Sequence, residues 1–468
     1  MSSDIRVEQR KENKMGGMPV KKLIITMSLP MMISMLIQAL YNIVDSIFVA
    51  RINEYALTAV SLAFPFQSLM IAFATGTGVG YNAFLSKSLG EKEYERANNV
   101  ARHALFLALC TYLGFLILGQ VIAAPFFRIQ TDIPEIVDYG ITYLRIVCVF
   151  SFGMFFQMTL ERLLQSTGRT FYTMITQTLG AVINLIFDPI LIFGLFGFPK
   201  LGIAGAAMAT IFGQIVAGCL AFYFNMTKNP DIDIKPSHFL HFRPNLQIIK
   251  RIYAVGIPSI IMASIGSVMT FGMNRILMAF TSTATAVFGV YFKLQSFVFM
   301  PVFGLNNGMV PIISYNYGAR KPDRIKEAIG TGIMFAAIIM IFGTVIFQLF
   351  PDKLLKVFSA SDNMMAIGIP ALRIISISFV FAGISIPIIS TCQALGHGMM
   401  SLAVSVIRQL VVLLPSAFIL SKTLGLNATW VSFILSELSG CALCLYFLLR
   451  LVKEEINPLE EDAQSISV

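Results

Sequence analysis

Charged residues are scarce in this chain, and their scarcity narrows the class of protein. Only 13% of the 468 residues are Asp, Glu, Lys or Arg, whereas soluble domains carry about 25%. Hydrophobic residues make up 56%, and the mean hydropathy is +0.76. These values exclude an ordinary soluble enzyme and indicate a polytopic membrane protein, which crosses the bilayer many times.

Cysteine and histidine are also few, and neither marks a chemical site. All six cysteines lie in apolar segments, where we expect reduced packing residues and no disulfide framework: Cys110, Cys148, Cys219, Cys392, Cys441 and Cys444. The four histidines are dispersed: His103, His238, His241 and His397. The chain has no His-Glu-x-x-His, Walker or Gly-x-Ser-x-Gly motif. We therefore expect no enzyme, no cofactor, no structural metal and no nucleotide site, so that any pumping draws on an ion gradient or a partner.

Long apolar runs fill most of the sequence instead. Each is long enough to cross a bilayer as a helix, which takes about 20 residues. Twelve can be read, at residues 23–50, 56–86, 101–127, 136–164, 170–196, 203–226, 250–280, 284–315, 328–350, 364–395, 400–421 and 426–450. The first is too long for a signal-peptide core, so we expect it to remain as a helix.

The net charge of +9 follows the loops and forms no single basic face, which argues against nucleic-acid binding. One set of alternate loops, with both termini, holds about 22 lysines and arginines, and the other set holds about 6. Positive loops stay inside, so we expect both termini to be cytoplasmic.

The second half of the chain repeats the first with an offset of 228 residues. Pro30 corresponds to Pro258 in this register. The same offset pairs Gln67-Ser68 with Gln295-Ser296, Gly76 with Gly304, Gly80 with Gly308, Gly90 with Gly318, Arg96 with Arg324, and Leu144-Arg145-Ile146 with Leu372-Arg373-Ile374. Near the end the offset falls to 222, where Gly218-Cys219 meets Gly440-Cys441.

This repeat predicts an all-α fold of twelve transmembrane helices in two six-helix lobes. Because six is even, both lobes begin on the same side, and the pseudo-two-fold repeat is parallel. We expect an amino-terminal arm at 1–19, an N-lobe at 20–228, a cytoplasmic linker at 229–245, a C-lobe at 246–452 and a tail at 453–468. The first 18 residues and those after about Asn457 are polar, and we expect both to be poorly ordered. Twin lobes around a central cleft suit alternating access.

One short stretch carries an acid that needs an explanation. Asp188 lies inside the apolar run 170–196, where a charged residue costs about 2.5 to 3.5 kcal/mol on insertion scales. Asn184 lies one turn earlier on the same face, and Pro189 leaves the carbonyl of Leu185 without its helical donor. The alternatives are a functional site or a kinked helix with a neutral or paired acid, and we favour the functional site.

Polar residues of two other helices lie at the same depth as Asp188. The first helix has a stripe on one face, made of Ser34, Gln38, Asn42 and Asp45. Counting 1.5 Å per residue, Asp45, Asp188 and Thr210 all fall within about two turns of the outer surface. With Asn184 they form a predicted cation site, which could hold a proton or a sodium ion, and the sequence does not choose between the two.

A further set of polar residues is predicted to line a substrate cavity: Gln38, Asn42, Gln67, Glu161, Gln177, Lys293, Gln295 and Arg408. Glu161 is expected either to contact a cationic substrate or to pair with Arg162 or Arg169. For Lys293 and Arg408 the alternative to a cleft role is pairing, for example with Glu437, or snorkelling at a helix end. We expect Arg275 to pair or to snorkel at a helix end.

These motifs resemble the multidrug and toxic compound extrusion (MATE) transporters, in particular their MepA-like branch. The resemblance covers nearly the whole chain and rests on the early Pro30 and Asp45, on Gly-x-Gly-x-x-Tyr-Asn near Gly78, on Asn-x-x-x-Asp-Pro at 184–189, on Gly-Ala-Ala-x-Ala-Thr ending at Thr210, and on Tyr-Asn-Tyr-Gly-Ala at 315–319. It implies drug efflux in exchange for protons or sodium ions, with the N-lobe cation site at Asp45, Asn184, Asp188 and Thr210.

The second lobe departs from the members of that family that carry acids in helices seven and ten. Helix seven offers Asn274, and helix ten has no acid. The counterpart of Asp188 is Ser416, beside Pro415. We therefore expect ion coupling in the N-lobe alone.

The polar residues and the resemblance together predict a monomeric secondary active antiporter for small organic cations and other amphipathic drugs. The alternative is a flippase for a lipid-linked saccharide of the same superfamily, whose pyrophosphate would use Lys293 and Arg408.

Overall fold

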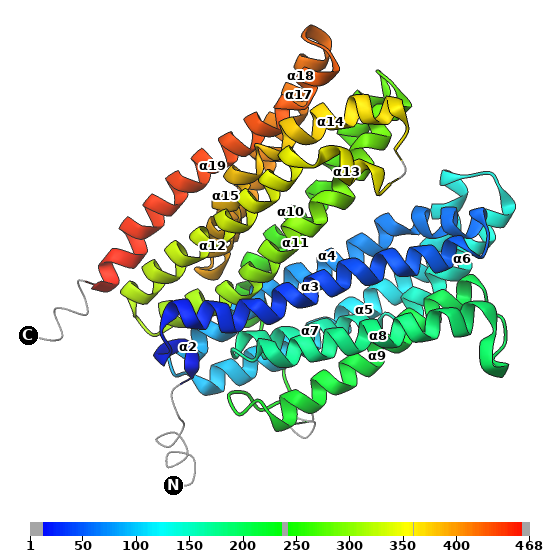
Figure 1. Cartoon of the computed structure of the whole chain (residues 1–468). Coiled ribbons are helices and arrows are strands. Elements are labelled where there is room, and N and C mark those ends of the chain that lie inside the picture. The colour runs from blue at the N-terminus through cyan, green and yellow to red at the C-terminus, as the bar shows by residue number, and fades with distance from the viewer. Residues whose placement is uncertain (1–12, 236–241, 359, 461–468) are drawn as a thin grey trace, which may run out of the picture.

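The computed structural model describes residues 13–235, 242–358 and 360–460, and in these ranges the chain is helical apart from the connections between helices. The helices form two bundles (Figure 1). The N-lobe, drawn from blue to green, holds residues 20–227, and the C-lobe, drawn from green to red, holds residues 246–460. The predicted fold class, an all-α polytopic membrane protein, is confirmed.

The helices of the N-lobe follow the apolar runs of the sequence. They are α3 (Val20–Ala50), α4 (Glu54–Gly90), α5 (Tyr94–Gln130), α6 (Pro134–Val149), α7 (Phe152–Ser166), α8 (Thr170–Phe193) and α9 (Ile203–Thr227), with the short η1 (Leu195–Gly197) after α8. Asn53 caps α4, because its side-chain oxygen accepts a hydrogen bond from the amide of Ala56 at 2.7 Å.

The C-lobe repeats this order. It contains α10 (Leu246–Met278), α11 (Ser282–Gly318), α12 (Pro322–Leu349), α13 (Pro351–Lys356), α14 (Asp362–Ser376), α15 (Phe379–Ala394), α16 (Gly398–Val406), the π-helix η3 (Ile407–Leu413), α17 (Leu414–Thr423), α18 (Leu426–Thr429), α19 (Val431–Leu451) and the π-helix η4 (Val452–Ile456). Thr281, the counterpart of Asn53, caps α11 with a bond of 3.0 Å from the amide of Ala284.

Two of the twelve predicted spans are bent. Ten helices of the described chain are long and apolar enough to cross a membrane, and twelve spans result when each bent pair counts as one. The pairs are α6 with α7, bent by 46°, and α14 with α15, bent by 48°. A serine stands at each break: the Ser151 hydroxyl donates to the carbonyl of Cys148, and the Ser378 hydroxyl donates to that of Ile375. Such local bonds compete with the helical ladder and explain why the breaks need no proline.

The repeated glycines lie where the lobes meet. Gly80 of α4 packs on α10, and a Cβ there would overlap the carbonyl of Ile252. Gly308, its counterpart on α11, packs on α3, and a Cβ there would overlap Ser28. Each lobe therefore contributes one glycine-lined helix to the first helix of the other lobe.

A second glycine pair lies at the same interface between the two lobes, which we call the seam. A Cβ at Gly90 would overlap the carbonyl of Tyr315, and one at Gly318 would overlap that of Lys87. The two lobes thus meet backbone to backbone at one end of the molecule. We call this end the terminal face; it contains the α4–α5 turn (91–93) and the α11–α12 turn (319–321). In Figure 1 the lobes diverge toward the opposite, distal end, where α6 and α14 lie.

The prediction of a poorly ordered arm is wrong for residues 13–18, which the structure describes. Lys14–Gly17 forms α2, and the Asn13 side chain caps it by accepting from the amide of Met15 at 3.0 Å. Met15 is fully buried. A polar segment without a hydrophobic period is ordered here by tertiary contacts, which the sequence pattern does not report.

Residues 13–18 join the two lobes, and we call them the clasp. Asn13 Nδ2 donates to the carbonyl of Thr167 in the N-lobe at 3.1 Å. The carbonyl of Met15 accepts from Asn316 Nδ2 and from Arg324 Nη2 in the C-lobe, each at 3.0 Å. The clasp therefore fastens the terminal face across the seam.

The prediction of a poorly ordered tail is also wrong for residues 457–460. The last helix continues through η4 to Glu460, whose carboxylate lies 2.6 Å from Lys326 Nζ. Glu455 accepts a hydrogen bond from the Tyr317 hydroxyl at 3.0 Å and contacts His397. Residues 1–12 of the predicted arm, residues 461–468 of the tail, and His238 and His241 of the linker lie outside the described residues.

Candidate functional site

Two acids of the N-lobe lie against each other. The carboxyl groups of Asp45 on α3 and Asp188 on α8 are close enough to share a proton in a hydrogen bond. The Oδ1 atom of each is buried and has no hydrogen-bond donor among the described residues. Asp188 interacts electrostatically with Asp45 and with no lysine or arginine of the described chain. The pair is a concentration of negative charge without a built-in cation.

The depth of this pair agrees with the helix ends. Asp45 lies five residues before the end of α3, and Asp188 lies five residues before the end of α8. At 1.5 Å per residue both acids are about 8 Å from the distal ends of their helices. The pair is therefore near the end at which the lobes diverge.

Asn184 and Thr210 complete the predicted group. With the Asn184 amide turned so that its nitrogen faces the acid, it donates to Asp188 Oδ2 at 3.0 Å. Its oxygen then accepts from the Thr210 amide at 3.1 Å and from the Thr210 hydroxyl at 3.0 Å. The structure thus brings together all four residues of the predicted cation site. Helix α8 runs unbroken through Pro189.

Two tyrosines that were not predicted from the sequence also face the acids. The phenol groups of Tyr41 and Tyr143 lie within electrostatic range of both Asp45 and Asp188. Tyr41 precedes Asp45 by one helical turn, which is a usable signal. Tyr143 comes from α6 and carries no such signal. The Gln67 side chain, a predicted cavity residue, donates to the Tyr143 hydroxyl at 3.2 Å.

A second polar centre lies deeper in the N-lobe, around Glu161 of α7. This carboxylate is 2% exposed and accepts three hydrogen bonds. The donors are Gln157 at 3.0 Å, Thr176 at 2.9 Å and Gln177 at 2.9 Å. Gln177 lies eleven residues before Asp188 on α8, which separates the two centres by about 16 Å along the helix.

Neither predicted arginine partner forms an ion pair with Glu161, although Arg162 lies within electrostatic range of it. Arg162 Nη1 donates to Gln165 at 2.8 Å and to Asn307 of the C-lobe at 2.9 Å. Arg169 pairs with Asp231 at 3.5 Å. The hydrogen bonds to Glu161 therefore come from neutral donors, and its neighbour Arg162 adds a polar link between the lobes.

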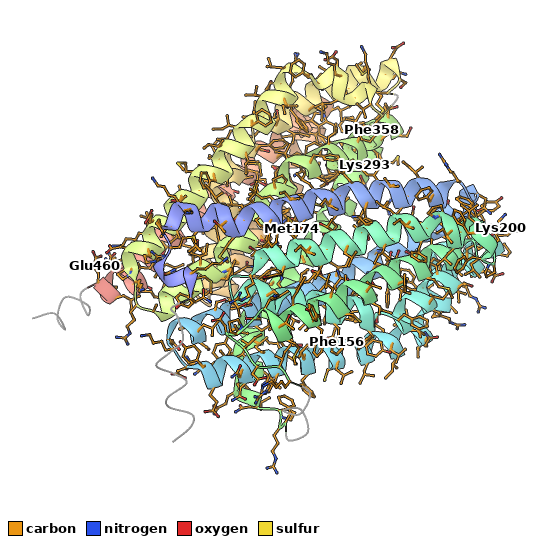
Figure 2. All side chains as sticks on the ribbon, turned by 60° about the horizontal axis from the view of Figure 1, so that its bottom comes forward. Phe156, Met174, Lys200, Lys293, Phe358 and Glu460 are labelled. Atoms are coloured by element: carbon orange, nitrogen blue, oxygen red, sulfur yellow. The ribbon has the colours of Figure 1, made fainter. Side chains whose placement is uncertain are left out.

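The remaining predicted cavity residues are dispersed. Lys293 of α11 is exposed, and its ammonium lies 6.0 Å from the centre of the Phe358 ring (Figure 2). Gln38 and Asn42 are exposed on α3, and Gln295 is half-buried on α11. The structure does not bring these four into contact with the acid pair.

Arg408 adopts the second of its two predicted arrangements. Its Nη1 atom donates to both carboxylate oxygens of Glu437, at 3.0 and 3.1 Å. Arg275 is exposed and lies over the Phe271 ring at 5.7 Å, near the end of α10, as expected of a snorkelling side chain.

A family model agrees with this geometry. The MatE model matches residues 30–190 and again residues 258–419, which together make up well over half of the chain. The chain belongs to the MatE family. The two matches begin at Pro30 and Pro258, which correspond to each other in the internal repeat.

Curated relatives match this chain over nearly its whole length. The multidrug export protein MepA of Staphylococcus haemolyticus is 28% identical over 444 residues, with 94% of each chain covered. A FAD transporter of Shewanella oneidensis is 26% identical, with 92% of this chain and 95% of that protein covered. The predicted resemblance to the MepA-like branch is confirmed.

Solved structures give the same result. One, described as the outward-facing conformation of a multidrug resistance MATE family transporter, has a TM-score of 0.89 at 27% identity and covers 97% of this chain and 99% of its own. Another, a MOP superfamily transporter from Pyrococcus furiosus described as having a binding pocket of reverse polarity, has a TM-score of 0.88 at 27% identity and covers 96% of this chain and 99% of its own.

Proposed function

We propose that this protein is a multidrug efflux antiporter that exports amphipathic, mostly cationic compounds in exchange for protons or sodium ions. Membership of the MatE family and the similarity to MepA proteins support export of drugs by a transporter. The exchange with an ion is inferred from the site itself.

The contact between Asp45 and Asp188 carries the proposal. Two carboxylates in a low-dielectric site repel each other, and neither is stable there without a compensating cation. The described chain supplies none at this point. A proton shared by the pair, or an alkali cation bound by carboxylate, amide and hydroxyl oxygens, would supply it. A proton or cation that binds from solution can also be released, which ion–drug exchange requires.

The arrangement of the lobes suits one state of such a cycle. They are fastened at the terminal face by the glycine seam and the clasp, and they diverge at the distal end, near which the acids lie. In the proposed cycle, an ion from outside binds the acid pair and favours release of the drug. The lobes then close at the distal end and open at the terminal face, and the ion leaves inward. Because coupling is reciprocal in free energy, drug and ion disfavour each other's binding.

The protein acts in this proposal as a monomer in the bacterial cytoplasmic membrane. The terminal face, which has the positive loops, would lie in the cytoplasm. The drugs and the lipid bilayer are its partners, and we propose no other.

Replacing Asp188 tests the proposal. In proteoliposomes with an imposed ion gradient, Asp188→Asn is expected to reduce dye efflux to the level of empty vesicles, because the site loses one of its two negative charges and one carboxylate ligand for the coupling cation. Ser416→Ala, at the counterpart position of the C-lobe, is the matched control and should retain efflux. Full gradient-driven efflux by Asp188→Asn would contradict the mechanism.

A second candidate substrate class is a pyrophosphate compound, either a lipid-linked saccharide or a dinucleotide. The FAD transporter relative and the exposed Lys293, which has no acidic partner in the described chain, favour it. The pairing of Arg408 with Glu437 weakens it, because one cation remains where two were predicted. Lys293→Ala should leave dye efflux intact under the first proposal, and loss of anionic-substrate transport in that variant would support the second.

A further inference from the structure

The last two helices of each lobe are joined by a polar bridge, and the two bridges differ in charge. In the N-lobe, Asn184 of α8 contacts Thr210 of α9 beside the acid pair. In the C-lobe, the segment of α16, η3 and α17 corresponds to α8, and α19 corresponds to α9. There Arg408 of η3 contacts Glu437 of α19. The bridge of the N-lobe is thus neutral and lies next to two acids, whereas the equivalent bridge of the C-lobe is an ion pair.

The acids of the N-lobe site have no acidic counterparts. With the offset of 228, Asp188 corresponds to Ser416 and Asp45 corresponds to Met273, which is fully buried. The Ser416 hydroxyl donates to the carbonyl of Val412 at 2.6 Å and is thereby used within its own helix. The described C-lobe therefore has no carboxylate at the positions that correspond to Asp45 and Asp188.

The ion pair lies about one turn away from that position. Arg408 lies four residues before Val412, the counterpart of Asn184, and Glu437 lies five residues after the counterpart of Thr210. Along the helices these steps are about 6 and about 8 Å, both toward the terminal face. The pair thus lies between the same two helices as the N-lobe bridge, one turn deeper.

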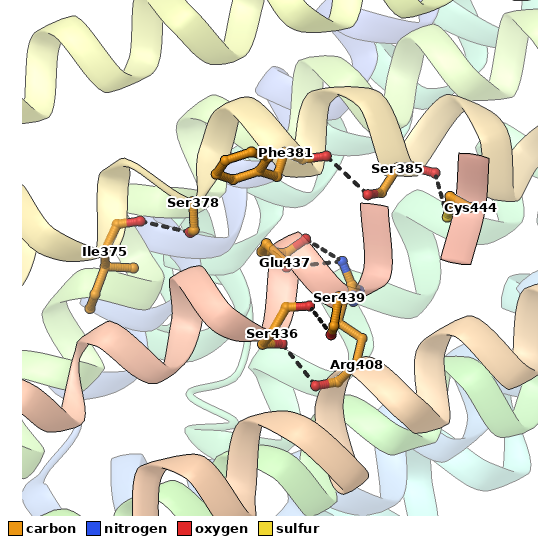
Figure 3. Close-up of polar contacts among 9 residues, drawn as sticks. All are labelled: Ile375, Ser378, Phe381, Ser385, Arg408, Ser436, Glu437, Ser439 and Cys444. Carbon is orange, nitrogen blue, oxygen red and sulfur yellow. Dashed lines mark hydrogen bonds and ion pairs between the residues drawn. The ribbon is translucent and has the colours of Figure 1, made fainter. Parts of the chain in front are cut away.

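The contact is well formed and largely buried. Figure 3 shows the Arg408 side chain reaching the Glu437 carboxylate, with Ser436 beside it. The bonds to the two oxygens are 3.0 and 3.1 Å, and the side chains are 15% and 16% exposed. Tyr291 of α11 is buried within electrostatic range of Glu437.

The local backbone makes room for this pair. Arg408 lies on the π-helix η3, a helix type found often at functional sites. The Ser436 hydroxyl donates to the Arg408 carbonyl at 2.8 Å. A Cβ on Gly440 of α19 would come within 2.9 Å of Arg408 Cδ, so glycine there leaves the path of the side chain free. The described α8 has no π-helical segment.

We propose that Arg408 is a tethered cation, whose guanidinium takes at Glu437 the place that the exchangeable ion takes at Asp45 and Asp188. A buried carboxylate needs a counter-ion in either lobe. In the C-lobe the chain supplies it, and a covalently attached counter-ion cannot be released. Arg408 therefore sets the ion stoichiometry, because it keeps the C-lobe from binding a coupling ion. This inference rests on the proposed function, in which the N-lobe binds the ion.

The test is to remove the tethered charge and count ions. Arg408→Met keeps an unbranched apolar stem and frees Glu437. In proteoliposomes, the substrate gradient that balances a given ion gradient at zero net flux gives the ions exchanged per substrate. We expect this number to rise by one in Arg408→Met. The purified variant should also gain thermal stability when the coupling ion is added, beyond the gain of the unaltered protein.

The double variant Arg408→Met with Glu437→Gln is the matched control. It lacks both charges, so it should exchange as many ions per substrate as the unaltered protein. A number lower by one would mean that Glu437 already carries an ion and would overturn the proposal. An unchanged number in folded Arg408→Met would overturn it as well.

Folding of the single variant need not limit the test. If Arg408→Met does not yield folded protein, Arg408→Gln replaces it, since its amide can still donate to Glu437. The double variant has no unpaired charge, and it tests by itself whether Glu437 already carries an ion in the unaltered protein. Failure of the proposed function would look different, because the unaltered protein would then show no ion exchange at all.

Discussion

The two lobes share one fold but differ in whether a basic residue neutralises their buried carboxylates. In the N-lobe, Asp45 and Asp188 lie together, with an unpartnered oxygen on each and no basic residue of the described chain beside Asp188. In the C-lobe, the bridge between the equivalent helices contains Glu437, and Arg408 neutralises it. The backbone repeat is therefore not matched by a repeat of these charged residues.

This difference shows how a duplicated scaffold can become asymmetric with few changes. A buried carboxylate must be compensated, and the compensation can be covalent or exchangeable. Covalent compensation gives a stable lobe, and exchangeable compensation gives an ion site. The seam does not share this asymmetry, because Gly80 and Gly308 each pack against the first helix of the other lobe.

The largest effect is expected when the N-lobe acids are removed. Asp45→Asn should abolish gradient-driven efflux, whereas Asn184→Ala should only weaken the apparent ion affinity, by about tenfold, the effect of losing about 1.4 kcal/mol from one hydrogen-bonding ligand. Efflux rates measured over a range of ion concentrations separate the two. Equal and total loss in both variants would show that the amide is as essential as the acid.

The next effect concerns the stability of the fold, and it distinguishes the acids of the N-lobe from the ion pair of the C-lobe. Glu437→Leu leaves Arg408 buried without a partner and should cost about 3 to 5 kcal/mol, whereas Arg408→Met with Glu437→Leu should come close to the unaltered protein. Asp188→Asn should not lower stability, because it relieves the repulsion of two like charges. Thermal unfolding midpoints in detergent measure all three. A double variant as unstable as Glu437→Leu would contradict the account of the pair.

The seam should respond equally on both sides. Gly80→Ala and Gly308→Ala each place a Cβ against the first helix of the other lobe, and each should slow efflux severalfold by weakening the closure of the terminal face. Gly114→Ala is the control, since no atom lies within 4 Å of a Cβ there. Distances between spin labels at exposed Lys92 and Arg320 report the separation of the lobes. A strong effect at one glycine only would mean that the seam is asymmetric too.

The smallest effect is expected at the clasp. Arg324→Met removes a charged donor to the Met15 carbonyl and should weaken docking of residues 13–18 by about 2 kcal/mol. Arg96→Met, at the counterpart position, loses contacts with Ser88 and two nearby glutamates but none with the clasp. Hydrogen exchange at residues 14–18 should therefore rise in the first variant only.

The sequence was sufficient for the features that local patterns encode. Apolar runs predicted the spans, the offset of 228 predicted the duplication, and polar spacing combined with the rise per residue gathered Asp45, Asn184, Asp188 and Thr210. In each case one helix at a time supplies the information, and the depth of the bilayer aligns the helices.

Features made by contacts between distant segments could not be predicted in this way. The clasp is polar and short, and it is ordered by partners about 300 residues away. Tyr143 reaches the acids from a bent pair of helices whose break contains no proline. For Arg408, sequence left two arrangements open, because only the π-helix and Gly440 direct its side chain toward Glu437.

Substrate-driven ion flux tests the central claim most directly. Reconstituted protein is given a drug gradient, and movement of protons and of sodium ions is followed in turn. The account predicts flux of one of these ions in the unaltered protein, none in Asp45→Asn or Asp188→Asn, and unchanged flux in Ser416→Ala. Ion flux that persists in both acid variants would contradict it.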